Sequence, residues 1–185
     1  MSLKKKLIRL AYERPDLRSK IVPILAEQER LRVAAEKATK VTFMQAVLDR
    51  PEQLKEWVMS QSGVPSMTGW DFKCHHMTLE FFGGKGNASS LEPYAEYLGN
   101  SYVLDITGIA FDEYCCAVVL DTKLPVKKKH PHITIAVNGV KPSYSNDLLK
   151  NGISLPVKGK VRVTVGYFDG RGGGDKFEFP HDYKG

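Results

Sequence analysis

The stretch KCHHMTLEFFGG, residues 73–84, places two histidines at the start of an apolar, strand-like run. Successive side chains of a β-strand point to opposite faces, so residues two apart share a face. His76 and Thr78 should therefore project together, while the apolar residues Met77 and Leu79 point the other way. The stretch predicts a strand with one face for the core and one face that offers an imidazole and a hydroxyl.

The same arrangement occurs a second time in HPHITIAVNG, residues 130–139. His132 and Thr134 share one face of this predicted strand, and the apolar Ile133 and Ile135 share the other. A single His-x-Thr pair on a strand is more often a surface pair or a core histidine with its hydrogen bonds satisfied. Two copies, each flanked by apolar residues, favour a common chemical role.

Two imidazoles and two hydroxyls suit the cleavage of a phosphodiester without a metal ion. A neutral histidine takes a proton from the attacking oxygen, while a protonated histidine gives one to the leaving oxygen. Unperturbed imidazole titrates at about pH 6.5, so both forms are available near neutral pH. Threonine hydroxyls can donate to the non-bridging phosphate oxygens, where negative charge grows in the transition state. Such a site would need neither a metal nor another cofactor.

The segments HMTL and HITI resemble the paired H-x-T/S-hydrophobic motifs of the two-histidine (2H) phosphoesterase superfamily, which includes RNA 2′,3′-cyclic phosphodiesterases. HITIAVNGVKPSYSNDLL is similar to the cyclic phosphodiesterase domain of fungal and plant tRNA ligases, where V-K-x-x-x-S-N precedes a short helix. The resemblance covers about residues 70–168. It implies a bilobal α+β fold in which two antiparallel sheets surround a central cleft. It also implies that His76 and His132 are catalytic and that Thr78 and Thr134 bind phosphate.

The other histidines do not match these motifs. Neither His75 nor His130 has Ser or Thr two residues on, and strand alternation should turn His75 away from the site. His181 lies near the end of the sequence and is assigned no role.

Three residues near the motifs are candidates for contacting a substrate. Lys129 belongs to a basic loop, KLPVKKKH, which either contacts phosphates or is a solvated turn. Lys85 follows the first motif in the glycine-rich turn GGKGN, whose spacing is not that of a Walker-type phosphate loop. Tyr144 can stack on a base, although an aromatic residue is more often part of a core or rim.

The first third of the chain differs from the rest. Apolar residues recur at helical spacing in LKKKLIRLAYE and IVPILAEQERLRVAAEKATK, and TFMQAVLD and PEQLKEWVMSQ are also predicted to form short helices. We therefore expect a helical extension over residues 1–60 and a phosphoesterase domain over residues 61–185. The extension should pack on that domain or dock a protein partner.

Strand and turn signals dominate from about residue 70. The predicted strands cover residues 71–82, 102–122 (as two strands), 130–137, 158–169 and 175–180. Short helices are predicted for residues 88–100, closed by Gly99, and for residues 145–152.

Composition narrows the class of protein. The 185 residues include 27 Lys and Arg against 21 Asp and Glu, a net charge of +6, which favours anionic partners but is also common among soluble proteins. The three cysteines form no disulfide framework or metal motif. No apolar run reaches the length of a membrane span, and the start of the chain is too charged for a signal peptide. We expect a cytoplasmic protein, in the host cytoplasm if it is viral, with no membrane partner.

The leading interpretation is a metal-independent phosphodiesterase that hydrolyses 2′,3′-cyclic phosphate ends of RNA. One alternative keeps this machinery but acts on cyclic di- or oligonucleotide second messengers, as phage relatives do when they silence host defence. Another alternative is an RNA-binding or assembly module that has the fold but little catalysis. The sequence leaves open which histidine is the base and whether the product is a 2′- or a 3′-phosphate.

Overall fold

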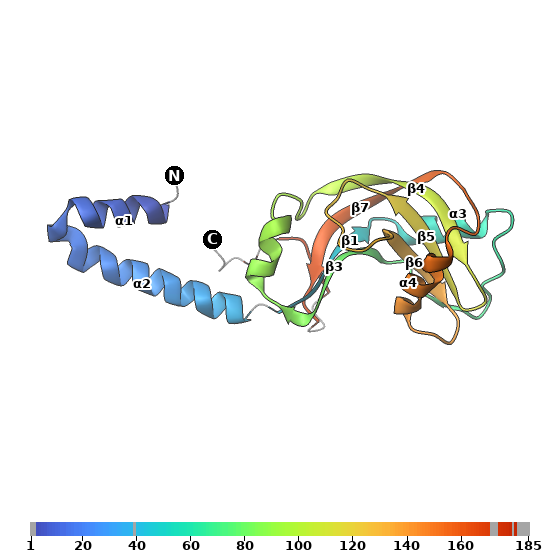
Figure 1. The fold of residues 1–185 in the computed structure, drawn as a ribbon, viewed down its shortest axis with the longest axis horizontal. Coiled ribbons are helices and arrows are strands. Elements are labelled where there is room, and N and C mark those ends of the chain that lie inside the picture. Colours follow the sequence, from blue (N-terminus) through green and yellow to red (C-terminus); the bar gives the residue numbers. More distant parts are fainter. Residues whose placement is uncertain (1–2, 39, 171–173, 179, 181–185) are drawn as a thin grey trace.

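The computed structural model describes residues 3–38, 40–170, 174–178 and 180, and shows a mixed α+β protein with a sheet at its centre (Figure 1). His181 lies outside the described residues. The long strands are β1 (Val41–Leu48), β3 (His76–Gly86), β4 (Ser101–Phe111), β5 (Cys115–Asp121), β6 (His132–Val137) and β7 (Gly159–Phe168), and the short ones are β2 (Asp71–Phe72) and β8 (Asp175–Lys176).

The six long strands form a closed antiparallel ring. They are ordered β1-β3-β6-β5-β4-β7, and β7 also pairs with β1. The short strands lie off this ring, because β2 pairs with β6 and β8 pairs with β7. Instead of the two antiparallel sheets that we expected, the described strands form one sheet. The two motif strands are joined directly by the pairing of β3 with β6, and β1 closes the ring by pairing with β3 on one side and with β7 on the other.

Strand β1 was not predicted from the sequence. We expected TFMQAVLD to be a short helix, but VTFMQAVL is a strand. An apolar run of this length fits a buried strand as well as a helix, and its periodicity cannot distinguish them. Burial on both faces explains the absence of alternation, because Met44, Gln45 and Ala46 are all fully buried. The sheet therefore begins at Val41, inside the segment that we expected to be a helical extension.

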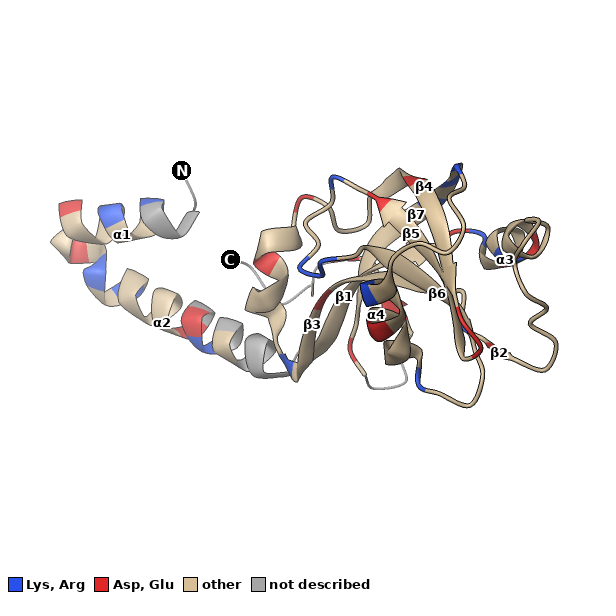
Figure 2. Cartoon of the chain, turned by 45° about the vertical axis from the view of Figure 1, so that its right-hand side comes forward, with Lys and Arg blue, Asp and Glu red and all other residues tan. Residues whose placement is uncertain are grey.

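The helices α1 (Leu3–Glu13) and α2 (Pro15–Ala38) form a hairpin that projects from one end of the sheet domain (Figure 1). Acidic and basic residues are interleaved along α2, whereas the one acidic residue of α1, Glu13, is its last residue (Figure 2). Several apolar side chains of the hairpin are exposed, among them Tyr12, Val22 and Ile24. Among the helices of the described residues, none is both long and apolar enough to cross a bilayer.

Shorter helices lie between the strands. Helix α3 (Pro51–Met59) begins at a proline, as predicted, and buries Leu54 and Val58. The predicted helix at residues 88–100 is a 3₁₀ helix, η1 (Ala88–Tyr94), capped by Asn87. The helix predicted at 145–152 is α4 (Ser145–Leu148), preceded by η2 (Pro142–Tyr144) and followed by η3 (Leu149–Asn151).

The core positions the two motif strands. Met77 and Leu79 of β3, and Ile133 and Ile135 of β6, are fully buried in the main hydrophobic cluster. Their alternate neighbours must therefore face the other side of the sheet, as the period of two requires. On that side, α4 packs beside β5 and buries Leu148 in a second apolar cluster. Its first residue thereby comes close to β6.

Candidate active site

The two His-x-Thr strands meet at a single point. Met77 of β3 pairs with Ile133 of β6 in an antiparallel register, so the motif residues on either side of each are brought together. A pocket of about 540 Å³ lies over this contact. All four motif side chains line it, namely His76, Thr78, His132 and Thr134.

The environment of His132 is closed and polar. The residue is only 6% exposed. Its Nδ1 lies 2.8 Å from the carbonyl oxygen of His130, which can only accept, so Nδ1 carries a proton. Its Nε2 lies 2.8 Å from Oγ of Ser145. Burial lowers the pKa of His132, and the hydrogen bond to the His130 carbonyl opposes this by raising it.

Ser145 connects the second motif to helix α4. Its hydroxyl contacts Nε2 of His132, accepts a hydrogen bond from the Thr134 hydroxyl at 3.0 Å, and lies 2.8 Å from the Pro142 carbonyl oxygen. A hydroxyl has one proton, so it donates either to a neutral His132 or to Pro142. In the second case a protonated His132 donates to Ser145. Both protonation states of His132 are therefore accommodated.

His76 is held by stacking and by its neighbour. Its ring stacks on Phe43 with centroids 5.0 Å apart, and its Nδ1 lies 3.0 Å from Nδ1 of His75. Burial lowers the pKa of His76 to about 4, the neighbouring His75 acts in the same direction, and Asp175 acts in the opposite direction. His76 is therefore neutral near neutral pH.

His75 lines the pocket, so our prediction that strand alternation turns it away was wrong. Strand β3 begins at His76, and residues 73–75 belong to no strand. The alternation of side chains between the two faces of a strand therefore does not extend to His75. On its other side, Nε2 of His75 lies 3.2 Å from a carboxylate oxygen of Asp175 in β8.

Two lysines bring positive charge to the pocket. Lys128 is half-buried, donates to the side-chain oxygen of Asn146 at 3.1 Å, and has its pKa lowered by burial. Lys73 forms an ion pair with Asp71 and also lines the pocket. An anionic substrate would be attracted to both ammonium groups.

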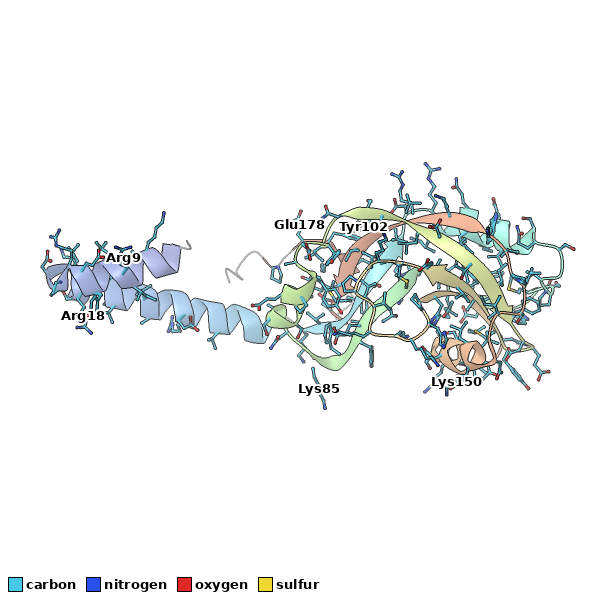
Figure 3. The ribbon with its side chains drawn as sticks, turned by 45° about the horizontal axis from the view of Figure 1, so that its top comes forward. Arg9, Arg18, Lys85, Tyr102, Lys150 and Glu178 are labelled. Carbon is cyan, nitrogen blue, oxygen red and sulfur yellow. The ribbon has the colours of Figure 1, made fainter. Side chains whose placement is uncertain are left out.

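The three substrate-contact candidates from the sequence are not among the residues that line this pocket. Lys129 is exposed, while its neighbour Lys128 points inward. Lys85 extends into solvent at the end of β3 (Figure 3). Tyr144 donates to Asp112 at 2.9 Å on the side of the second apolar cluster.

Aromatic residues form a further wall of the pocket that sequence reasoning did not identify. Phe43 stacks on both His76 and Phe168, and Phe81 lines the pocket although it is 66% exposed. Within the described part of the chain, no group of three or more His, Cys, Asp or Glu side chains could hold a metal ion.

Ser145 and Asn146 were also not singled out as site residues. The signal for them was present, because they are the S-N of the tRNA-ligase-like stretch that follows the second motif.

Residues 77–167 match the family model of the fungal tRNA ligase phosphodiesterase domain. The matched segment begins directly after His76 and contains Thr78, the second His-x-Thr pair and Ser145. Over this segment the match confirms the predicted resemblance to tRNA-ligase cyclic phosphodiesterase domains, and it points to a phosphodiesterase-type domain. No curated protein sequence matched the chain.

Proposed function

We propose that this protein hydrolyses 2′,3′-cyclic phosphate ends of RNA without a metal ion, with His76 and His132 as acid and base. The observation that carries the proposal is the pairing of Met77 with Ile133. It brings two imidazoles and two threonine hydroxyls to one pocket. The match to a tRNA ligase phosphodiesterase domain supports RNA as the substrate.

The reaction requires one proton to be removed and one to be supplied. One histidine takes a proton from a water molecule as its oxygen attacks phosphorus, and the other protonates the ribose oxygen as its bond to phosphorus breaks. The products are a phosphomonoester on one ribose oxygen and a free hydroxyl on the other. Thr78 donates to a non-bridging oxygen, and Thr134 does the same once its hydroxyl turns from Ser145 to the bound phosphate. Lys128 offsets the negative charge of these oxygens.

The walls of the pocket suit a nucleotide. Phe81 presents an exposed aromatic face on which an unpaired base can stack. Lys73 and Lys128 lie on the same pocket and can attract the phosphates. The proposed substrate therefore has its base toward the aromatic wall and its cyclic phosphate between the two histidines.

The experiment that tests this proposal is hydrolysis of a short RNA with a 2′,3′-cyclic phosphate end in the presence of EDTA. The intact protein should open the ring, and the His76→Ala and His132→Ala variants, shown to be folded by circular dichroism, should not. His130→Ala is a matched control, because the His130 side chain does not line the pocket. No turnover by the folded intact protein would contradict the proposal.

A substrate panel separates this function from its alternatives. Rapid loss of a cyclic dinucleotide, with no activity on RNA ends, would assign the same machinery to second messengers. Binding of RNA that both histidine variants retain, with no turnover of either substrate, would indicate a binding module.

A further inference from the structure

A chain of hydrogen-bonding groups runs from β8 to the catalytic pocket. The carboxylate of Asp175 lies 3.2 Å from Nε2 of His75, and Nδ1 of His75 lies 3.0 Å from Nδ1 of His76. The Asp175 side chain is 18% exposed, so it is sheltered from solvent, whereas His75 is half exposed. The order of the chain is therefore carboxylate, imidazole, catalytic imidazole.

The chemistry of these groups fixes the positions of the protons. A carboxylate can only accept, so Nε2 of His75 carries a proton and Nδ1 of neutral His75 has the lone pair. The contact between the two Nδ1 atoms needs one proton, which must then come from His76. With Nδ1 of His76 protonated, its Nε2 keeps a lone pair. None of the described residues hydrogen-bonds this Nε2, which leaves it available to a substrate or water.

The Asp175 side chain is held in place by a buried residue of the central sheet. Gln45 of β1 is fully buried and donates from Nε2 to the other carboxylate oxygen of Asp175. The pairing of β8 with β7 also depends on Gly166, because a Cβ there would lie 2.6 Å from the Lys176 carbonyl oxygen. The carboxylate therefore has a defined position, although it belongs to a strand of two residues.

We propose that His75 and Asp175 are positioning residues that hold the Nδ1 proton of His76, so that His76 is the general base and His132 the general acid. This inference rests on the proposed function. When Nε2 of His76 accepts the proton of the attacking water, the imidazolium keeps its Nδ1 hydrogen bond to His75. The Asp175 carboxylate then stabilises the positive charge through the His75 ring.

The assignment of the acid follows from the contrast between the two histidines. His132 donates from Nδ1 to a carbonyl and can donate from Nε2 to Ser145, so its protonated form is fully hydrogen-bonded. The titratable or charged groups that face His76 are His75, Asp175, Lys128 and His132, and only Asp175 favours its protonated form. His76 is therefore the neutral partner. Burial, Lys128 and His130 lower the pKa of His132 as well, but each ring nitrogen of its protonated form has an acceptor, so His132 takes the role of the acid.

The tautomer of His76 can be measured directly. Long-range ¹H–¹⁵N correlation spectra of the imidazole nitrogens should show His76 protonated at Nδ1 in the intact protein. Asp175→Asn replaces an acceptor by an amide that can also donate, so the His75 tautomer is no longer fixed and Nε2–H of His76 should become populated. Asp105→Asn is a matched control, because Asp105 is an exposed carboxylate on β4 outside the pocket.

Kinetics provide the second readout. Asp175→Asn should lower kcat by about 10-fold to 100-fold and change KM by less than about twofold, because the substitution weakens proton transfer and leaves the substrate contacts in place. His75→Gln keeps a carbonyl that can accept from Nδ1 of His76, so it should retain more of kcat than His75→Leu does. Thermal unfolding of each variant shows that the loss does not come from unfolding.

The outcomes separate this inference from the proposed function. Two results would overturn the positioning role and leave the proposed function intact, provided that the protein hydrolyses RNA cyclic phosphate. One is a His76 that is protonated at Nε2 in the intact protein. The other is an Asp175→Asn variant in which both kcat and the His76 tautomer are unchanged. A folded protein that opens no cyclic phosphate, but whose His76 tautomer responds to Asp175→Asn, would refute the proposed function. Positioning by His75 and Asp175 would then stand.

Discussion

The Ser145 hydroxyl lies 2.8 Å from Nε2 of His132 and connects this buried imidazole to helix α4. Ser145→Ala should lower the free energy of unfolding by about 1–3 kcal/mol, because the imidazole loses its hydrogen-bond partner in a closed site. It should also lower kcat by about tenfold, since the ring is no longer held toward the substrate. Urea unfolding and steady-state kinetics measure the two effects. The exposed Ser66, changed to alanine, is the control, and equal effects of both changes would contradict the role of Ser145.

Thr78 provides a test of transition-state stabilisation. Thr78→Val keeps the shape of the side chain and removes its hydroxyl, so kcat should fall by about 100-fold while KM changes little. Thr78→Ser keeps the hydroxyl and should lose much less. Single-turnover kinetics on an RNA cyclic phosphate distinguish the two variants. Similar rate constants for valine and serine would show that the hydroxyl does not contact the phosphate.

Lys128 and Lys129 are neighbours in the chain, but only Lys128 lines the pocket. Lys128→Met removes a half-buried positive charge beside the substrate, so KM should rise by about tenfold and depend less on salt. Lys129→Met is the matched control and should change KM by less than about twofold, because an exposed ammonium is screened. A larger effect at Lys129 would reverse the assignment.

The buried histidines predict how stability depends on pH. The pKa of His76 is lowered from its ordinary value of 6.5 to about 4 in the folded state, so the unfolded state binds more protons between these values. The free energy of unfolding should therefore fall as pH decreases from about 6.5 to about 4, by roughly 3 kcal/mol for this one group. The lowered pKa of His132 contributes with the same sign.

Urea unfolding at several pH values across this range measures the dependence. His76→Gln removes the titrating group, so the variant should lose less stability on acidification than the intact protein. Parallel curves for the two proteins would mean that His76 titrates normally in the folded state.

The four motif residues could be predicted because their placement depends on local geometry alone. The period of two puts His76 with Thr78, and His132 with Thr134, on one face of a strand, and apolar neighbours fix which face is buried. The structure places all four on one pocket. Their catalytic and phosphate-binding roles stay predictions until the variants are measured.

The rest of the site depends on contacts between distant parts of the chain. His75 reaches the pocket because β3 begins only at His76, and its partner Asp175 comes from a two-residue strand near the end of the chain. The direction of a loop side chain cannot be predicted from a sequence pattern either. Lys128, and not Lys129, points into the pocket because it donates a hydrogen bond to Asn146. The strand nature of β1 was hidden because both of its faces are buried.

Closure of the sheet into a ring has a consequence for the order in which the protein folds. Strand β1, the first along the chain, pairs with β3 and with β7, the last of the long strands. Phe43 of β1 lies opposite Phe168 of β7. Contacts between segments so far apart carry a large loop-closure entropy and are among the slowest to form. During synthesis the ring cannot close until β7 has emerged, and β8, which pairs with β7, emerges later still. The closed ring and the contact of Asp175 with His75 are therefore completed only in the last stage of folding, after both histidine strands have been made.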